Sequence, residues 1–396
     1  MDNINIALIS EEFPPFMFGG IASFCYDLAR SLSRKRIFTT VFSGKAKKLT
    51  IEKFGDYLRV IRLPCLDIPP RFLWFQLQNI KILREELQDF DILHVGNPQV
   101  GAICSHLKKK LKKKLVTSIH GFPLYDLKVL IKSSISNWTL GDLGCNLLEY
   151  PLNEINIRSC LTKSDHIITC SFNTLNEMKT LYPNLDLNNV SVIYNGVDFD
   201  KIDNVVNNPV NGDGENGFSI MYYGRLYWRK GIIHLIRAVA NQKSDFHDID
   251  LQIFGRGPLK QKIRRLISRF DLEEKVHLRG HVSYNGLIRE IKKAKIIVLP
   301  SLYEAQPISV LEAMACGKAV VAFDFPFARE YITHMSNGVL ANAEDIEDLS
   351  NKIRILLSDK KLRSKLGKNA RKYVKRNHNW DVLVEKYVEK YEWLTQ

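Results

Sequence analysis

Several patterns that assign proteins to familiar classes are missing from this sequence. The seven cysteines form no C-x-x-C pair, which argues against the common zinc and redox motifs, and their odd number and wide spacing do not indicate a disulfide framework. No apolar run is long enough to span a bilayer. The chain starts with an acidic residue and a strand pattern, without the basic and apolar segments of a signal peptide. We therefore expect a cytoplasmic protein, whose contact with a membrane, if it makes one, is peripheral and on the inner face.

The dinucleotide-binding pattern G-x-G-x-x-G is also absent, which argues against a dinucleotide cofactor, and we expect no cofactor of any kind. What is present is a chain of 396 residues with 45% hydrophobic content, enough to bury two cores of ordinary size. Its 57 basic and 43 acidic residues give a net charge of +14, which favours an anionic partner. Nucleic acid is disfavoured as that partner, because the basic residues are not interleaved with aromatic residues in a recognised pattern.

Short apolar runs alternate with helical patterns along the whole chain, which predicts two doubly wound α/β domains. The expected strands are residues 4–10, 39–43, 59–63, 92–95, 115–119, 167–170, 191–194, 218–223, 250–254, 276–278, 296–299 and 319–322. Residues 200–217 are rich in Asn, Gly and Asp and mark the boundary. We place the first domain at 1–205, the second at 206–378, and a terminal helix with a large apolar face at 379–396.

In the first domain, a glycine pair precedes a helix expected to begin at Ile21. Backbone N–H groups and the helix dipole favour an anion there, so Gly19 and Gly20 are candidates for binding phosphate, although such a pair serves a tight turn equally well. His94 and His120 end two strands, at the edge where open α/β sheets bind ligands. We favour a function for His120 and leave His94 open between a functional and a structural role.

Two other stretches of this domain are rich in basic residues and could lie on its surface. Residues 108–114, KKKLKKK, are expected to be a solvated helix end with cations at the negative pole of the dipole. Residues 71–87 combine aromatic and basic side chains, which suits either core or a patch at a membrane interface. We favour core for this second stretch.

In the second domain, the first strand ends in Gly224-Arg225, and Lys230-Gly231 follows at the start of a helix. A guanidinium and an ammonium group there can hold the oxygens of a diphosphate as negative charge develops on it. The alternative is a set of solvated cations on a loop. We favour function for Arg225 and Lys230 but not for their neighbour Arg229.

The segment from Lys295 to Phe323 reads as strand, loop, helix and strand. Glu304 lies in the loop and Glu312 in the helix, which is expected at 307–316, so both face the ligand edge of a parallel sheet. They can therefore reach different parts of one extended ligand. The plain alternative is a loop acid and one solvated helix glutamate.

The string S-x-x-E-x7-E-A-M-A-x-G at Ser301–Gly317 resembles the donor-binding signature of glycosyltransferase family 4. Matching motifs elsewhere are G-R-x-x-x-x-K-G at 224–231, the loops at 255–258 and 280–282, the Asn-Gly pair at 195–196, Pro14-Pro15, Gly19-Gly20 and the Trp380 helix. The resemblance covers essentially the whole chain. It implies the GT-B fold, in which two Rossmann-like domains face each other across a cleft and the C-terminal helix crosses back to the first domain.

The resemblance also implies roles for particular residues. Arg225, Lys230 and the amides at Gly19 and Gly20 would hold the diphosphate, Glu312 the ribose hydroxyls, and Glu304 and His120 the donor sugar; His120, Arg225, Lys230 and Glu304 would be the catalytic set. The remaining donor-binding residues are expected to be Asn195, Arg256, Val282, Ala305, Gln306, Pro307 and Ile308. Many family members have glycine directly after the first glutamate, where this chain has Ala305, so the sugar preference does not carry over.

The implied activity is that of a retaining, metal-independent glycosyltransferase of hexosyltransferase type. The partners would be a nucleotide-diphosphate sugar, with UDP or GDP as the nucleotide, and a glycan, lipid-linked or small-molecule acceptor. The alternative is a non-catalytic or metal-dependent protein that binds nucleotide sugars or another anionic ligand.

Three further alternatives are weaker. A metal-dependent transferase needs an Asp-x-Asp motif at the ligand edge, and residues 89–91, 198–200 and 248–250 do not lie there. A glycosidase with Glu304 and Glu312 as its carboxylates would leave the phosphate-binding residues without a purpose. An inverting transferase needs a general base, for which the first domain offers four side chains that the sequence cannot exclude: His120, Asp126, Glu11 and Glu12.

Overall fold

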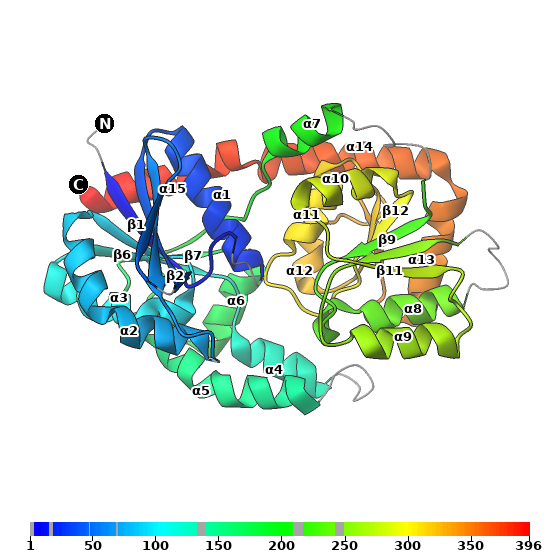
Figure 1. The fold of residues 1–396 in the computed structure, drawn as a ribbon. Coiled ribbons are helices and arrows are strands. Elements are labelled where there is room, and N and C mark those ends of the chain that lie inside the picture. Colours follow the sequence, from blue (N-terminus) through cyan, green and yellow to red (C-terminus); the bar gives the residue numbers. More distant parts are fainter. Residues whose placement is uncertain are drawn as a thin grey trace. The chain divides into compact units, whose positions relative to one another are not determined.

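The computed structural model describes residues 4–15, 19–46, 48–68, 70–132, 140–208, 217–241 and 249–396. The chain forms two compact α/β units, each with its own sheet and helices (Figure 1). The first unit comprises Met1–Tyr125, Gly144–Gly196 and Trp380–Gln396, and the second comprises Asp126–Leu143 and Val197–Asn379. The chain thus passes between the units four times, after Tyr125, Leu143, Gly196 and Asn379. The domain limits expected at 205/206 and 378/379 stay a prediction.

The sheet of the first unit has eight strands in the order β3-β4-β2-β1-β5-β6-β7-β8. They are β1 (Asn5–Ile9), β2 (Phe38–Ala46), β3 (Thr50–Lys53), β4 (Leu58–Pro64), β5 (Ile92–Val95), β6 (Lys114–Ile119), β7 (His166–Thr169) and β8 (Val190–Val192). All neighbours are parallel except β3, which pairs antiparallel with β4 at the edge. The sequence prediction missed β3, because this short strand is largely exposed and has no apolar run.

Both faces of this sheet are covered by helices, as its apolar strands require. Along β1, Ile6 and Leu8 belong to a core with α1 (Gly20–Arg34) and α15 (Trp380–Thr395), whereas Ala7 and Ile9 belong to a core with α2 (Arg71–Glu86) and α3 (Gly101–Leu111). This alternation follows from the two-residue period of a strand. The remaining helices along this part of the chain are α4 (Pro123–Lys132), α5 (Leu140–Lys163) and α6 (Phe172–Leu181).

The last helix, α15, packs against α1 within the first unit (Figure 1). Its buried face consists of Trp380, Leu383, Val384, Tyr387, Tyr391 and Leu394, as the helical spacing of these residues predicts. The chain therefore enters the second unit and returns, so that its C-terminal segment completes the core of the first.

The sheet of the second unit has six parallel strands in the order β11-β10-β9-β12-β13-β14. They are β9 (Ile220–Tyr223), β10 (Leu251–Phe254), β11 (Val276–Gly280), β12 (Ile296–Val298), β13 (Val320–Phe323) and β14 (Val339–Ala341), of which β14 was not expected. The helices are α7 (Phe199–Asn207), α8 (Ile232–Ala240), α9 (Lys260–Arg269), α10 (Tyr284–Lys293), α11 (Ile308–Ala315), α12 (Pro326–Arg329), α13 (Ile346–Ser358) and α14 (Lys360–Asn377).

One expectation about local structure needs correction, and another stays a prediction. The boundary placed at 200–217 is the one that stays a prediction: α7, capped by Asp198, covers its first part, and residues 209–216 lie outside the described residues. The run 108–114 is not one helix end, because only Lys108–Lys110 are in the last turn of α3, Lys112 is left-handed, and Lys114 begins β6.

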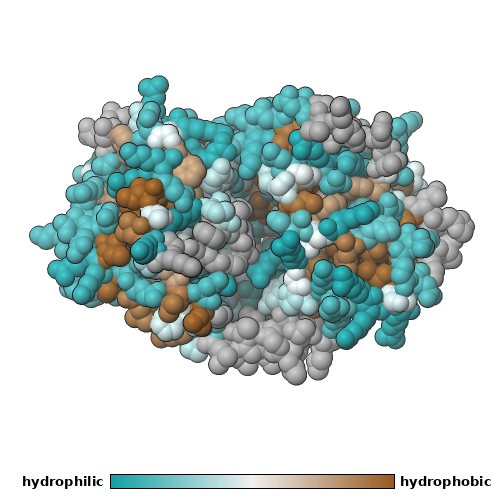
Figure 2. Space-filling model, in the orientation of Figure 1, coloured by the Kyte–Doolittle hydropathy of each residue, from teal (hydrophilic) through white to brown (hydrophobic). Residues whose placement is uncertain are grey.

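The stretch 71–87 forms α2, which is both core and surface. Phe72 and Phe75 are buried, whereas Leu77 and Ile80 are exposed. The view in Figure 2 is mostly hydrophilic, with separate hydrophobic areas. No helix among the residues that the structure describes is both long and apolar enough to cross a membrane.

Candidate functional site

The candidate site of the second unit lies on two loops at the carboxyl edge of its sheet. Strands β9 and β12 are parallel neighbours, so the loops that follow them, residues 224–231 and 299–307, leave the sheet side by side. These are the loops that carry Arg225, Lys230 and Glu304. The sheet topology alone therefore brings together residues that are more than seventy positions apart in the sequence.

The backbones of these two loops pack directly against each other. Gly231 has a φ of 66°, and a Cβ at this position would lie 1.7 Å from the carbonyl oxygen of Pro300. The N–H of Leu302 donates to the carbonyl of Arg229 at 2.7 Å. Gly231, the second glycine of the G-R-x-x-x-x-K-G motif, is thus required for two reasons: its backbone conformation and the close approach of the neighbouring loop.

The close packing brings Lys230 and Glu304 into an ion pair. The Lys230 ammonium donates to a Glu304 oxygen that also accepts from the Ser301 hydroxyl at 2.9 Å, and the Glu304 side chain is only 7% exposed. Burial raises the pKa of Glu304, but the charges of Lys230 and Arg229 and the two hydrogen bonds outweigh it and hold that pKa below its usual value. Burial lowers the pKa of Lys230, against the opposing effect of Glu304.

Arg229 is also a charged residue of this site, although the sequence analysis assigned it no role. Its guanidinium forms an ion pair with Asp126 at 2.8 Å, and both side chains are partly buried. Burial raises the pKa of Asp126, and Arg229 opposes this effect. Arg225 differs from both of its basic neighbours, because it is exposed and lies over the ring of Tyr227 at 5.5 Å.

Glu312 lies in α11, on the helix that follows the Glu304 loop, and it is half-buried. The hydroxyl of Tyr223, the last residue of β9, donates to the carbonyl of Ser309 in the first turn of the same helix. The pKa of Tyr223 is raised well above its usual value, first by burial and then by the charge of Glu312. Glu304 and Glu312 thus lie in the loop and the helix that the sequence predicts.

The other candidate donor-binding residues of the second unit are on the same edge or next to it. Gln306 and Pro307 are buried, Ala305 and Ile308 are half-buried, and all four complete the loop into α11. Arg256 and Val282 follow β10 and β11. A Cβ at Gly255 would lie 1.8 Å from the carbonyl of Gly224, so the loop after β10 packs against the one that carries Arg225.

In the first unit, the structure separates the two strand-end histidines. His94 is fully buried, and its ring nitrogens lie 2.6 Å from the Tyr391 hydroxyl and 2.8 Å from that of Ser118. This is a structural role, which the sequence left open. The half-buried His120 packs on Phe24, with 4.3 Å between the centres of the two rings, and its Nε2 is buried without a hydrogen-bond partner. Burial lowers the pKa of each histidine to about 3.

The remaining candidates of this unit lie near the start of α1 and at the end of the unit. Gly19 is in an extended conformation, with open space where a Cβ would stand, and no side chain caps the helix that begins at Gly20. Asn195 is buried just before the chain enters the second unit. Glu11, a candidate base, has a pKa raised to about 8 by burial and by Glu12 and Glu149.

Among the residues that the structure describes, no group of three or more His, Cys, Asp or Glu side chains is placed to hold a metal ion. Of the three Asp-x-Asp strings, 89–91 precedes β5, and Asp198 caps α7. Asp248, in the third string, lies outside the described residues.

Comparison with known proteins identifies the family. Residues 18–201 match the family model "Glycosyltransferase Family 4", and residues 206–373 match "Glycosyl transferases group 1". This chain is a glycosyltransferase family 4-like protein of the GT-B fold. The two matches together cover most of its length, and they cover both units.

Individual relatives agree with this assignment. The chain is 27% identical to an uncharacterized glycosyltransferase of Methanocaldococcus jannaschii, over 99% of both chains. Its fold is similar to that of sucrose-phosphate synthase from Thermosynechococcus elongatus, with a TM-score of 0.79 and 20% identity over 99% of both chains. It is also similar to Anabaena HepE in complex with UDP-glucose, with a TM-score of 0.72 and 17% identity over 98% of this chain and 99% of that one.

Proposed function

We propose that this glycosyltransferase uses a nucleotide-diphosphate sugar, with UDP or GDP as the nucleotide, and keeps the anomeric configuration of the transferred sugar. Arg225 and Lys230 would hold the diphosphate together with the amides at Gly19 and Gly20, and Glu312 would accept from the ribose hydroxyls. Glu304 and His120 would bind the donor sugar. The crystal structure of HepE in complex with UDP-glucose supports this class of donor.

The observation that carries the proposal is the ion pair between Lys230 and Glu304. An ammonium group that is already oriented by a buried carboxylate can contact the departing diphosphate without the free-energy cost of reorganising at the moment of reaction. The exposed guanidinium of Arg225 can offer two parallel hydrogen bonds to phosphate oxygens. These two cations would do the work that a divalent ion does in metal-dependent transferases, so we propose that the reaction needs no metal.

The burial and the contacts of the candidate bases favour retention over inversion. An inverting reaction needs a base that takes the acceptor's proton near neutral pH. Glu11, with a pKa of about 8, is mostly protonated at pH 7, and a His120 pKa of about 3 makes its imidazole a weak base. Asp126 is engaged by Arg229. In the retaining reaction, the departing phosphate would take the proton instead, and His120 would bind a sugar hydroxyl.

For the acceptor we propose only a class of molecule: a glycan, a lipid-linked glycan or a small molecule. The basic balance of the chain and the exposed apolar residues of α2 suit a peripheral contact with an anionic membrane surface on its cytoplasmic side. We propose no nucleic-acid partner.

A ligand panel followed by two variants tests the proposal. In EDTA, one of UDP, GDP or their sugar conjugates should raise the melting temperature, since a ligand at a hundred times its Kd adds about 2.7 kcal/mol to the free energy of unfolding. With that donor, Arg225→Ala and Lys230→Ala should each lower turnover on the order of 100- to 1000-fold, the usual loss for one preorganised donor to a developing charge.

The matched control is Arg264→Ala, which removes an exposed arginine of α9 outside the proposed site. It should leave turnover unchanged. Near-normal rates in both site variants would refute the roles of Arg225 and Lys230. Activity that disappears in EDTA and returns with manganese would favour a metal-dependent reaction, and ligand binding without any transfer would favour the non-catalytic alternative.

A further inference from the structure

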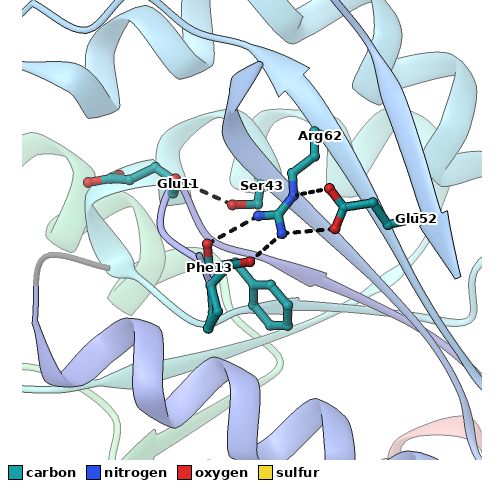
Figure 3. A network of polar contacts seen from close by, with 6 residues as sticks. Glu11, Phe13, Ser43, Glu52 and Arg62 are labelled. Carbon is teal, nitrogen blue, oxygen red and sulfur yellow. Dashed lines mark hydrogen bonds and ion pairs between the residues drawn. The ribbon is translucent and has the colours of Figure 1, made fainter. Parts of the chain in front are cut away.

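A buried arginine of the first unit, Arg62, contacts the loop between β1 and α1, residues 10–19. Arg62 is on β4 and is 2% exposed (Figure 3). Its Nη1 donates to the carbonyl of Phe13 at 3.1 Å, its Nη2 donates to the carbonyl of Pro14, and its guanidinium lies 5.5 Å from the centre of the Phe13 ring. A buried arginine therefore holds two consecutive carbonyl groups of this loop.

The carboxylate of Glu52, on the neighbouring edge strand β3, provides the opposite charge to the Arg62 guanidinium. Nε and Nη2 of Arg62 donate to the two carboxylate oxygens of Glu52 at 3.1 Å each (Figure 3). Glu52 pairs with Val60 across β3 and β4, so Arg62 is its diagonal neighbour, two residues further on the same face. A two-point contact of this kind sets the plane of the guanidinium as well as its position. The short strand β3 thereby orients the group that holds the loop.

The same loop is also held by the end of β2. The Ser43 hydroxyl donates to the carbonyl of Glu11 at 3.4 Å, and the N–H of Gly44 donates to the same carbonyl at 3.3 Å. Since β2 lies between β1 and β4, the chain leaves β1 across the ends of β2 and β4 before it reaches Gly19, five residues after Pro14. The contacts with Ser43, Gly44 and Arg62 therefore hold residues 11–14, which precede the glycine pair; residues 16–18, between them, lie outside the described residues.

We propose that Arg62 is a positioning residue for donor binding, oriented by Glu52, which sets the path of the β1–α1 loop so that the amides at Gly19 and Gly20 can meet the diphosphate. This inference rests on the proposed function, which places a diphosphate at those amides. Arg62 itself would not touch the donor. Its removal should therefore weaken the contacts of the loop with the second phosphate and spare the contacts of the nucleoside.

The test compares two ligands that differ by one phosphate. We would measure the Kd of UDP and of UMP, or of GDP and GMP if the panel selects guanine, for the wild type and for Arg62→Met. The variant should weaken binding of the diphosphate about tenfold, the equivalent of one good hydrogen bond, and leave binding of the monophosphate nearly unchanged. Hydrogen–deuterium exchange of the peptide that contains Glu11–Phe13 should become faster in the same variant.

Two milder variants cover the possibility that Arg62→Met does not fold. Arg62→Lys keeps the charge but cannot form the paired contact with Glu52, and Glu52→Gln changes a partly exposed side chain. Both should show the same selective loss in smaller measure, and the effects of Glu52→Gln and Arg62→Lys should not add, since both act through one contact. The matched control is Arg59→Met, an exposed arginine of the same strand, which should change neither ligand's Kd.

The outcomes separate this inference from the proposed function. Equal losses for the diphosphate and the monophosphate, or no loss for either, overturn the positioning role. Faster exchange with an unchanged ratio of the two Kd values also overturns it, because Arg62 would then hold the loop without affecting the donor. If the wild type binds no nucleoside diphosphate at all, the proposed function fails together with the donor-binding role, and the exchange measurement still decides whether Arg62 holds the loop.

Discussion

Glu304 lies in the loop after β12 and Glu312 in the helix that follows it, but their surroundings differ, and the difference suggests separate tasks. Glu304 is buried, accepts from Ser301 and is paired with Lys230. Glu312 is half-buried on α11 and acts on Tyr223 through its charge. A ligand that reaches Glu304 must therefore approach a carboxylate already paired with a cation. At Glu312 we expect hydroxyl groups of a ligand at the helix to donate hydrogen bonds to the carboxylate.

Calorimetry on ligand fragments should separate the two glutamates. Glu312→Gln should weaken binding of the free nucleoside diphosphate by roughly 1.5–3 kcal/mol, since a charged acceptor of the ribose hydroxyls is lost. Glu304→Gln should weaken only the sugar-bearing donor, because its carboxylate is expected to meet the sugar, whereas the amide oxygen of the glutamine can still accept from Lys230 and keep its ammonium in place for the diphosphate. Glu347→Gln, an exposed glutamate of α13, is the control.

The assignment would be wrong if both glutamine variants lost the same affinity for the free diphosphate. It would also be wrong if Glu304→Gln bound the sugar-bearing donor as tightly as the wild type does. A parallel loss in the Glu347 control would instead indicate a general effect of surface charge.

At the scale of elements, α15 depends on a buried polar contact as well as on its apolar face. Tyr391 of this helix meets His94 of β5, and the second ring nitrogen of His94 meets Ser118 of β6. Each contact satisfies a polar group that would otherwise be buried without a partner. The pair of contacts fixes α15 in register on the sheet, which the apolar stripe alone specifies less sharply.

This contact makes stability sensitive to acid. Burial lowers the pKa of His94 to about 3, while the unfolded chain has the ordinary value near 6.5. Below pH 6.5 the unfolded state therefore takes up a proton that the folded state does not, so the contribution of His94 to stability is lost as the pH falls from about 6.5 towards 3. The slope for one such group approaches about 1.4 kcal/mol per pH unit.

Urea unfolding at pH 7 and pH 5 tests this effect. The wild type should lose about 2 kcal/mol more than His94→Gln does between the two pH values, since the variant lacks the group that titrates only in the unfolded state. Subtracting the two differences removes the contribution of the other titrating groups. Equal losses in both proteins would show that His94 is not neutral in the folded state.

At the scale of the whole molecule, the stereochemistry of the product tests the mechanism. Three of the candidate bases are poorly suited to take a proton at neutral pH, because Glu11 is mostly protonated, His120 is weakly basic and Asp126 is paired with Arg229. We therefore expect the leaving phosphate to accept the proton on the same face of the sugar. The product should keep the anomeric configuration of the donor. A proton NMR spectrum of the new linkage decides it.

His120→Ala supplies the companion measurement. It should lower the rate, because a contact with the sugar is lost, and added imidazole should not restore the rate in a pH-dependent way. An inverted product, or rescue of the variant by imidazole, would show that His120 or another side chain acts as a base and would refute the retaining mechanism.

The amino-acid sequence by itself determined the class of the fold, most of its strands and the family. Near-continuous apolar runs such as Ile296–Val298 are typical of strands buried on both faces. The motif from Ser301 to Gly317 matches the donor-binding signature of glycosyltransferase family 4. The positions of Glu304 in a loop and of Glu312 in a helix followed from the same local pattern. These features depend on short-range periodicity and on the placement of glycine and proline, which are visible without the partner segments.

Only the tertiary structure decided which side chains meet. The pairs Lys230 with Glu304, Arg229 with Asp126, and Arg62 with Glu52 join segments whose approach depends on strand order and register. The edge strand β3 has too few apolar residues to be recognised by its own pattern, yet it orients Arg62. The role of His94 was open for the same reason, since its partner Tyr391 is 297 residues away. Contacts of this kind arise when the fold brings separate strands, loops and helices together, and local periodicity does not predict them.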